Sequence, residues 1–184
     1  MATARRPDSW GAIKSAVQGK PVAELLSLVR DLYELSTANR QFLHARFGSR
    51  SRELDRYRAS IRSALCPDPL GRHPDPSIVT GKRLIREYER ATQDDGGTVD
   101  LMLTFVEAGT SFAEDVGFGD DSFFSSLSSM LESALARAQT LPWERREPIE
   151  PRLLSLRRSA GGIGWGFGDF VASAVEHFLA NERR

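Results

Sequence analysis

The stretch Val99–Leu135, VDLMLTFVEAGTSFAEDVGFGDDSFFSSLSSMLESAL, decides the fold class of this chain. Its apolar residues recur at steps of three and four, the spacing that places side chains on one face of an α-helix. The turn residues 117–119 separate two such runs. We therefore predict one helix over about 99–116 and another that starts near Asp121, joined as an antiparallel hairpin.

The same helical periodicity extends over the rest of the chain. The clearest stripe follows Pro21 and consists of Val22, Leu25, Leu26, Val29, Leu32 and Tyr33. Further helices are predicted over about 8–18, 36–47, 50–65, 80–92, 151–160 and 170–179, and the stretch 93–98 (QDDGGT) is predicted to be a break between helices. Strand-like alternation is not convincing anywhere. The predicted fold class is all-α, an irregular bundle or short stack of about eight to nine helices in antiparallel hairpins.

Length and composition describe an ordinary globular protein. The chain has 184 residues, of which 40% are hydrophobic and 27% charged, and we expect a single helical domain over 1–184 with a candidate hinge at the proline-rich loop 67–77. The lone Cys66 excludes an internal disulfide framework and a cysteine-rich zinc site. No apolar run approaches the ~18 residues of a membrane span, and the first residues lack the apolar core of a secretion signal. We expect a cytoplasmic protein with no membrane partner.

The 25 basic and 25 acidic side chains cancel in total but are segregated along the chain. Residues 1–92 hold 17 basic and 10 acidic groups, whereas residues 93–184 hold 8 and 15. The densest basic stretch contains Arg40, Arg46, Arg50, Arg52, Arg56, Arg58 and Arg62. One interpretation is a patch for nucleic acid or an acidic partner. The other is a solvated face that pairs with the acidic half, with Arg56 meeting Glu53 and Arg58 meeting Asp55 at i, i+3.

An acidic stretch from Asp94 to Asp121 contains no Lys or Arg. Asp115, Asp120 and Asp121 bracket a glycine turn and are candidate metal ligands, which would make the protein a metal-dependent hydrolase. The alternative is that Asp120 or Asp121 caps the following helix. Within the preceding helix, Asp100, Glu107 and Glu114 recur every seven residues and share one face, too far apart for a single ion. We interpret this stripe as a solvated or partner-facing surface.

The segment 161–169, GGIGWGFGD, looks like a phosphate cradle but lacks the required register and follows a helix instead of a strand. It is interpreted as a tight loop that packs its apolar side chains inward, with Asp169 capping the last helix. An exposed Trp165, with Phe167, would instead mark an interaction loop.

The sequence does not support a particular catalytic chemistry. The histidines His44, His73 and His177 are scattered, and Cys66 precedes a proline at a helix end, where an inert thiol is expected. No catalytic residue and no cofactor can be nominated, so the sequence leans against an enzyme.

Three stretches together resemble a bacterial family classed only as a domain of unknown function: LLSLVRDLYELSTANRQFLHARF (25–47), VEAGTSFAEDVGFGDDSFFSSLSSMLESAL (106–135) and IGWGFGD (163–169). The resemblance implies a soluble, cytoplasmic helical protein and supplies no activity. The sequence is most consistent with a non-enzymatic protein–protein interaction or scaffold module, with a protein partner or self-association through its segregated charges. Nucleic-acid binding through Arg40–Arg62 is the alternative.

Overall fold

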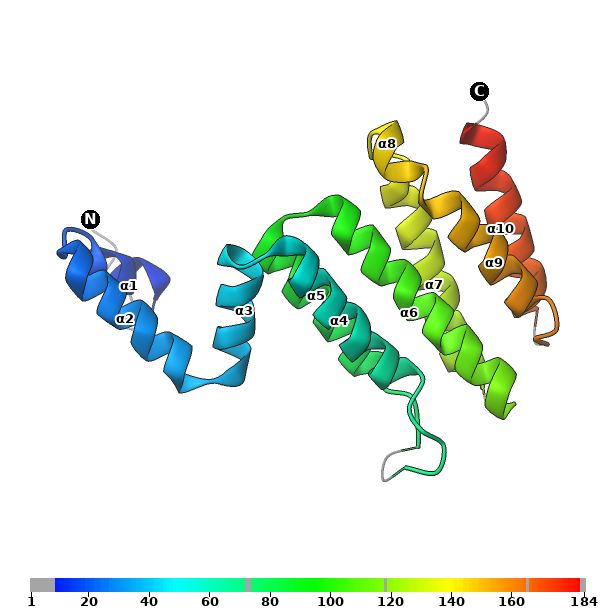
Figure 1. Ribbon diagram of the computed structural model, residues 1–184, viewed down its shortest axis with the longest axis horizontal. Helices are drawn as coiled ribbons and strands as arrows, with labels where there is room; N and C mark the ends of the chain where they lie inside the picture. Colours follow the sequence, from blue (N-terminus) through cyan, green and yellow to red (C-terminus); the bar gives the residue numbers. More distant parts are fainter. Residues whose placement is uncertain (1–8, 72–73, 118, 165, 183–184) are drawn as a thin grey trace, which may run out of the picture. The chain divides into compact units, whose positions relative to one another are not determined.

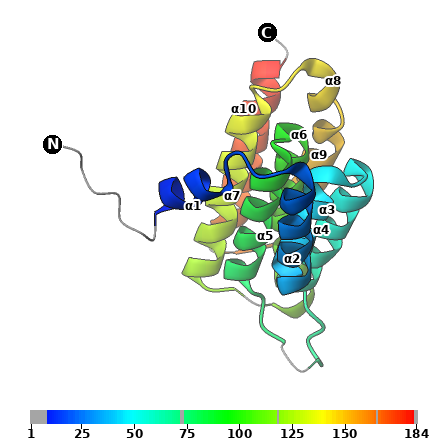
Figure 2. The ribbon, with the colours of Figure 1, turned by 90° about the vertical axis from the view of Figure 1, so that its left-hand side faces the viewer.

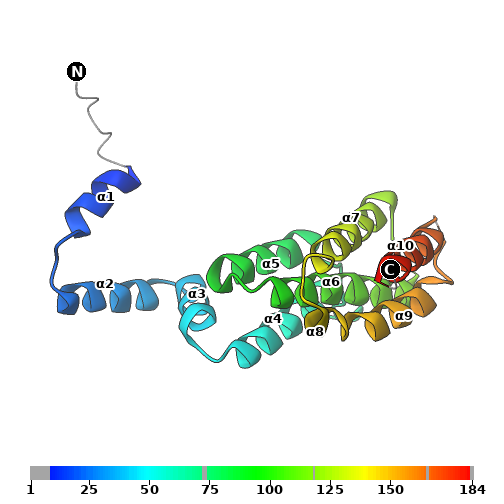
Figure 3. The same ribbon diagram turned by 90° about the horizontal axis from the view of Figure 1, so that it is seen from above.

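One long helix, α6 (Asp95–Val116), forms the centre of the C-terminal part of the chain in the computed structural model, which describes residues 9–71, 74–117, 119–164 and 166–182. Its side chains are buried around most of the circumference, including the neighbouring pair Phe105 and Val106. A helix that is apolar around most of its circumference has to lie inside a bundle. In agreement, α6 lies between α4 (Arg50–Leu65) and α5 (Ile78–Thr92) on one side and α7 (Asp121–Ala138) and α9 (Ile149–Ala160) on the other (Figures 1 and 3).

The remaining C-terminal helices complete this bundle. The last helix, α10 (Phe167–Glu182), packs on α7 and α9, and a single turn, α8 (Trp143–Arg146), precedes α9. Figure 2 shows α5, α6 and α7 running roughly along one direction, as expected for helices joined by short connections. Every element among the described residues is an α-helix, which confirms the predicted all-α fold class.

The chain divides into two compact units, residues 1–44 and 45–184. The first contains α1 (Trp10–Val17), α2 (Val22–Leu35) and most of α3 (Thr37–Phe47). The proline-rich loop 67–77, expected as a hinge in a single domain, lies within the second unit. It connects α4 and α5, which pack against each other, and the Ser77 amide donates to the Ala64 carbonyl oxygen at 2.7 Å. This hydrogen bond ties the two ends of the loop together.

The predicted break at 93–98 is confirmed only at Gln93 and Asp94, because α6 already begins at Asp95 and includes both glycines. The reason is close packing at Gly97, where a Cβ would overlap the Tyr88 hydroxyl and lie 2.7 Å from Asp94 Oδ2. Gly97 is therefore the residue that lets the first turn of α6 approach α5. The helix-breaking tendency of two glycines is overridden by this tertiary packing.

We predict different outcomes for alanine at the two glycines. Gly97→Ala is expected to reduce the free energy of unfolding by about 2 kcal/mol, because overpacking outweighs the gain in helix propensity. Gly96→Ala meets the Arg145 side chain, at 2.6 Å from Nη1 and 3.0 Å from Cδ; because this side chain is half exposed and can shift, the variant is expected to be nearly neutral. Urea unfolding of both variants measures the difference. Equal effects would show that packing at Gly97 does not matter.

Candidate interaction surfaces

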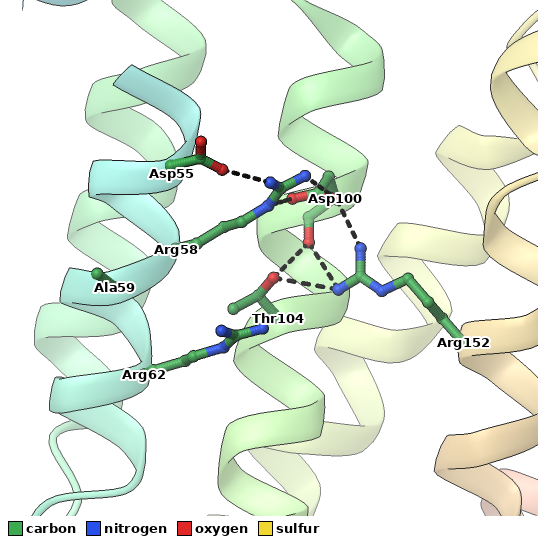
Figure 4. Close-up of a pocket in the computed structure, with 7 residues that line it drawn as sticks. All are labelled: Asp55, Arg58, Ala59, Arg62, Asp100, Thr104 and Arg152. Atoms are coloured by element: carbon green, nitrogen blue, oxygen red, sulfur yellow. Dashed lines mark hydrogen bonds and ion pairs between the residues drawn. The ribbon is translucent and has the colours of Figure 1, made fainter. Parts of the chain in front are cut away.

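A polar groove follows α6 between α4 and α9. It encloses a cavity of about 400 Å³ lined by Asp55, Arg58, Ala59, Arg62, Asp100, Thr104 and Arg152. Figure 4 shows two arginines reaching from α4 and one from α9 toward α6, where Asp100 lies between them. Asp100 lies on the one side of α6 that faces this groove, and 19% of its side chain is exposed.

Asp100 binds the guanidinium groups of both neighbouring helices. Arg58 donates to its two carboxylate oxygens, from Nε to Oδ2 at 2.6 Å and from Nη2 to Oδ1 at 2.8 Å. Arg152 donates from Nη1 to the same Oδ1, also at 2.6 Å. The hydrogen bond to Asp100 raises the pKa of Arg58 above its ordinary value. One carboxylate on α6 thus joins α4 to α9.

A second set of contacts fixes Arg152. Its Nε and Nη2 donate to the carboxylate of Glu107 at 2.8 Å each, and Nη2 also donates to the Thr104 hydroxyl at 3.1 Å. The Thr104 hydroxyl in turn donates to the Asp100 carbonyl oxygen. Such a paired, planar arrangement suits arginine and not lysine. We call Arg58, Asp100, Arg152 and Glu107 the charge clamp.

The groove offers little chemistry beyond this clamp. Arg62 also lines it and borders the adjoining cavity of about 480 Å³, but it has no ion pair or side-chain hydrogen bond within the described part of the chain. The residues lining the first cavity include no histidine or cysteine. Their arrangement therefore supports a structural role in holding three helices together.

The arginine-rich patch is divided among several partners. Both predicted i, i+3 pairs are present, Arg56 with Glu53 and Arg58 with Asp55, each at 2.6 Å. Arg46 donates to the Ala91 carbonyl oxygen, and Arg50 lies 3.9 Å from Asp94. Arg40 donates to the Tyr33 carbonyl oxygen within the first unit, and Arg52 is exposed. Two partners, Asp94 of Arg50 and Asp100 of Arg58, belong to the acidic half of the chain, as the pairing interpretation expected.

The candidate metal ligands do not converge into a site. Asp120 caps α7 by accepting the Phe123 amide at 2.8 Å, as the capping alternative predicts, and Asp115 accepts a hydrogen bond from Ser111. No group of three or more His, Cys, Asp or Glu among the described residues is placed to hold a metal ion. The metal-dependent hydrolase centred on Asp115, Asp120 and Asp121 therefore has no support in this geometry.

Of the two residues of the candidate interaction loop, only Phe167 lies among the described residues. Phe167 begins α10 and is buried, with its ring centroid 5.2 Å from that of Phe124, so it packs inward and is not part of an exposed interaction loop. Asp169 lies in the first turn of α10 and does not precede it as a cap. Trp165 lies outside the described residues. Burial raises the pKa of the Cys66 thiol, which agrees with an inert cysteine.

Most of the exposed large hydrophobic side chains among the described residues lie in the first unit. None of the residues 9–44 is buried, although α2 is strongly amphipathic. Its apolar side chains include Val22, which is 71% exposed, and Leu35, which is 75% exposed. We define the α2 face as Val22, Leu25, Leu28, Val29, Leu32 and Leu35. Because no residue of 9–44 is buried, the first unit has no hydrophobic core that covers the α2 face.

The C-terminal end of α2 is nevertheless held in a definite geometry by α3. The side chains of Asn39 and Arg40 donate to the carbonyl oxygens of Leu32 and Tyr33, at 2.8 and 3.2 Å. The hydroxyl of Tyr33 lies 3.0 Å from Nε2 of His44. These bonds satisfy carbonyl groups that a helix end leaves open. Arg40, predicted as a patch residue, thus shapes the end of α2.

Comparison of the chain with family models, with curated proteins and with solved structures finds no match. The resemblance to a bacterial family therefore stays a prediction. Among the described residues, no helix combines the length and the apolar character that crossing a membrane requires.

Proposed function

We propose that this protein is a non-enzymatic protein–protein interaction module that self-associates through the α2 face. The observation that carries the proposal is a row of aliphatic side chains along one side of α2, in a unit where none of the described residues is buried: five of the six residues of the α2 face are exposed, and Leu25 is half-buried. Contiguous apolar surface of this kind is a marker of a protein interface. Burying each such side chain against a partner contributes about 1.5–3 kcal/mol before the costs of association.

Apolar contact explains self-association better than charge matching does. Arg58 with Asp100 and Arg50 with Asp94 join the basic half to the acidic half inside one chain. Opposite charges that meet within a copy are less available to another copy. Nucleic-acid binding through Arg40–Arg62 has less support for the same reason, because Arg46, Arg56 and Arg58 all contact neighbouring groups of their own chain.

The proposal predicts a concentration-dependent dimer that Leu28→Glu disrupts. Light scattering on the full chain as it elutes from a size-exclusion column should give a mass above that of the monomer. Leu28→Glu should weaken association at least ~100-fold, because a charge then enters the contact from both copies. Ser27→Glu, on the polar side of the same helix, is the matched control and should associate like the wild type.

Salt separates the two modes of association. Apolar contact predicts an association constant that is unchanged or raised at high salt, whereas charge-matched association would weaken. A wild-type chain that stays monomeric up to about 200 µM, a concentration at which even a weak interface is populated, would contradict the proposed self-association.

A further inference from the structure

The α2 face has a symmetry that selects one way of pairing. The spacing of its positions 22, 25, 28, 29, 32 and 35 is symmetric about the midpoint between Leu28 and Val29. This midpoint is also the centre of the helix, which runs from Val22 to Leu35. At 100° per residue the six side chains fall within one stripe, opposite the polar residues Ser27, Arg30 and Glu34.

Resting on the proposed function, we infer that two copies pair their α2 helices antiparallel about a two-fold axis through this midpoint. Each position on one helix then faces its mirror position on the other. Val22 packs against Leu35 of the second copy, Leu25 against Leu32, and Leu28 against Val29. Such an isologous contact closes on itself and gives a dimer, not a filament.

Side-chain volume favours antiparallel over parallel pairing. In the antiparallel pair each of the two valines faces a leucine, so the combined side-chain volume of the facing residues varies little along the helix. In a parallel pair Val22 and Val29 would each meet their own copy, leaving two narrow positions among the wide ones formed by the four leucines. The antiparallel arrangement also places the positive end of each helix dipole beside the negative end of the other.

The residues on the two flanks of the stripe also favour antiparallel pairing. Leu26 and Tyr33 share one flank at 100° per residue, and Leu26 is 64% exposed. A two-fold axis perpendicular to antiparallel helices brings equal flanks together, so that Leu26 lies next to Tyr33 of the second copy. The opposite flank brings Glu24 near Asp31 of the second copy, a repulsion at the solvent edge that salt screens. Parallel pairing would set Leu26 and Tyr33 against this acidic flank.

Disulfide cross-linking tests the direction of pairing in the full chain. In a Cys66→Ser background, we expect Val22→Cys and Leu35→Cys to stay uncross-linked when each is oxidised alone, because equal ends lie about 20 Å apart in an antiparallel pair of this length. An equimolar mixture should give a covalent dimer with one copy of each, identified by intact mass. Ser27→Cys, on the polar side, replaces either partner as the control and should give no covalent dimer after oxidation.

The outcomes distinguish this inference from the proposed function. Cross-linking of Val22→Cys with itself, or an uncross-linked mixture from a chain that still dimerises, overturns the antiparallel pair while self-association stands. A chain that light scattering shows to be monomeric overturns the proposed self-association itself, as would docking of α2 on its own chain.

Discussion

Asp100→Ala is expected to lower the free energy of unfolding by about 3 kcal/mol. Removing this carboxylate leaves Arg58 and Arg152, which approach it from opposite sides, without the charge that holds them together. Breaking a largely buried ion pair by deleting one partner costs about 3–5 kcal/mol, and we take the lower end because 19% of Asp100 and about a third of Arg58 are exposed to solvent.

Urea unfolding of Asp100→Ala beside Asp55→Ala gives the test. Asp55 binds the same Arg58 at the same 2.6 Å distance, but its side chain is 67% exposed. Exposed pairs contribute less than about 1 kcal/mol, so the control should unfold almost like the wild type. Arg62→Ala, which removes a groove arginine outside the clamp, should also be nearly neutral. If Asp100→Ala were as stable as these two variants, the charge clamp would not hold the three helices together.

The helices themselves could be predicted because their signals are local. Apolar spacing places Leu84, Ile85 and Tyr88 on the buried side of α5, and Ser49 and Asp120 stand where α4 and α7 begin. The break was predicted to extend to residue 98, beyond its end at Asp94, because glycine has two uses that one sequence cannot separate. It breaks an isolated helix, but it also permits close contact between packed helices, and only the position of Tyr88 shows which use applies to Gly97.

The charge clamp could be predicted only in part. The seven-residue spacing of Asp100 and Glu107 correctly placed both on one face of α6, but suggested a solvated or partner-facing surface. Arg152 lies more than 40 residues farther along the chain, and nothing local to it indicates which acids it meets. The available signal was indirect: carboxylates on a helix that is apolar on its other sides need cationic partners from a neighbouring helix.

The amphipathic stripe after Pro21 could be predicted from the sequence, but its exposure to solvent could not. Periodicity states that a helix has an apolar face and not what covers that face. In unit 45–184 such faces meet in a common core, whereas in unit 1–44 none of the described residues is buried. The same pattern therefore has two consequences, a core in one unit and the proposed interface in the other.

Substitution of Asp94 is expected to have the second large effect on the free energy of unfolding, and the size of this effect depends on pH. Its carboxylate, 6% exposed, accepts from Arg145 at 2.6 Å and from the buried Tyr88 hydroxyl at 3.1 Å, just before the N-terminus of α6. Burial alone would raise the pKa of Asp94, but the hydrogen bonds that it accepts, first the one from Arg145, leave this pKa below its ordinary value. Ionised Asp94 therefore stabilises the folded state above about pH 4, and this contribution is lost as the pH falls through the lowered pKa.

We expect Asp94→Ala to reduce the free energy of unfolding at pH 7 by about 3 kcal/mol, since it removes a helix-terminal carboxylate and leaves the Tyr88 hydroxyl without its acceptor. Arg145 is half exposed, so its pairing adds little to this figure. Asp94→Asn should lose about half as much, because the amide keeps an acceptor for Tyr88 but no charge.

The difference between wild type and Asp94→Asn should shrink when urea unfolding is repeated at pH 3, below the ordinary pKa of an aspartate (~3.9), because the contribution of the Asp94 charge is lost as the pH falls through its lowered pKa. Asp95→Asn, in the exposed first turn of the same helix, is the matched control and should change stability little at either pH. A gap between wild type and Asp94→Asn that is equal at both pH values would mean that Asp94 stabilises α6 through its hydrogen bonds and not through its charge.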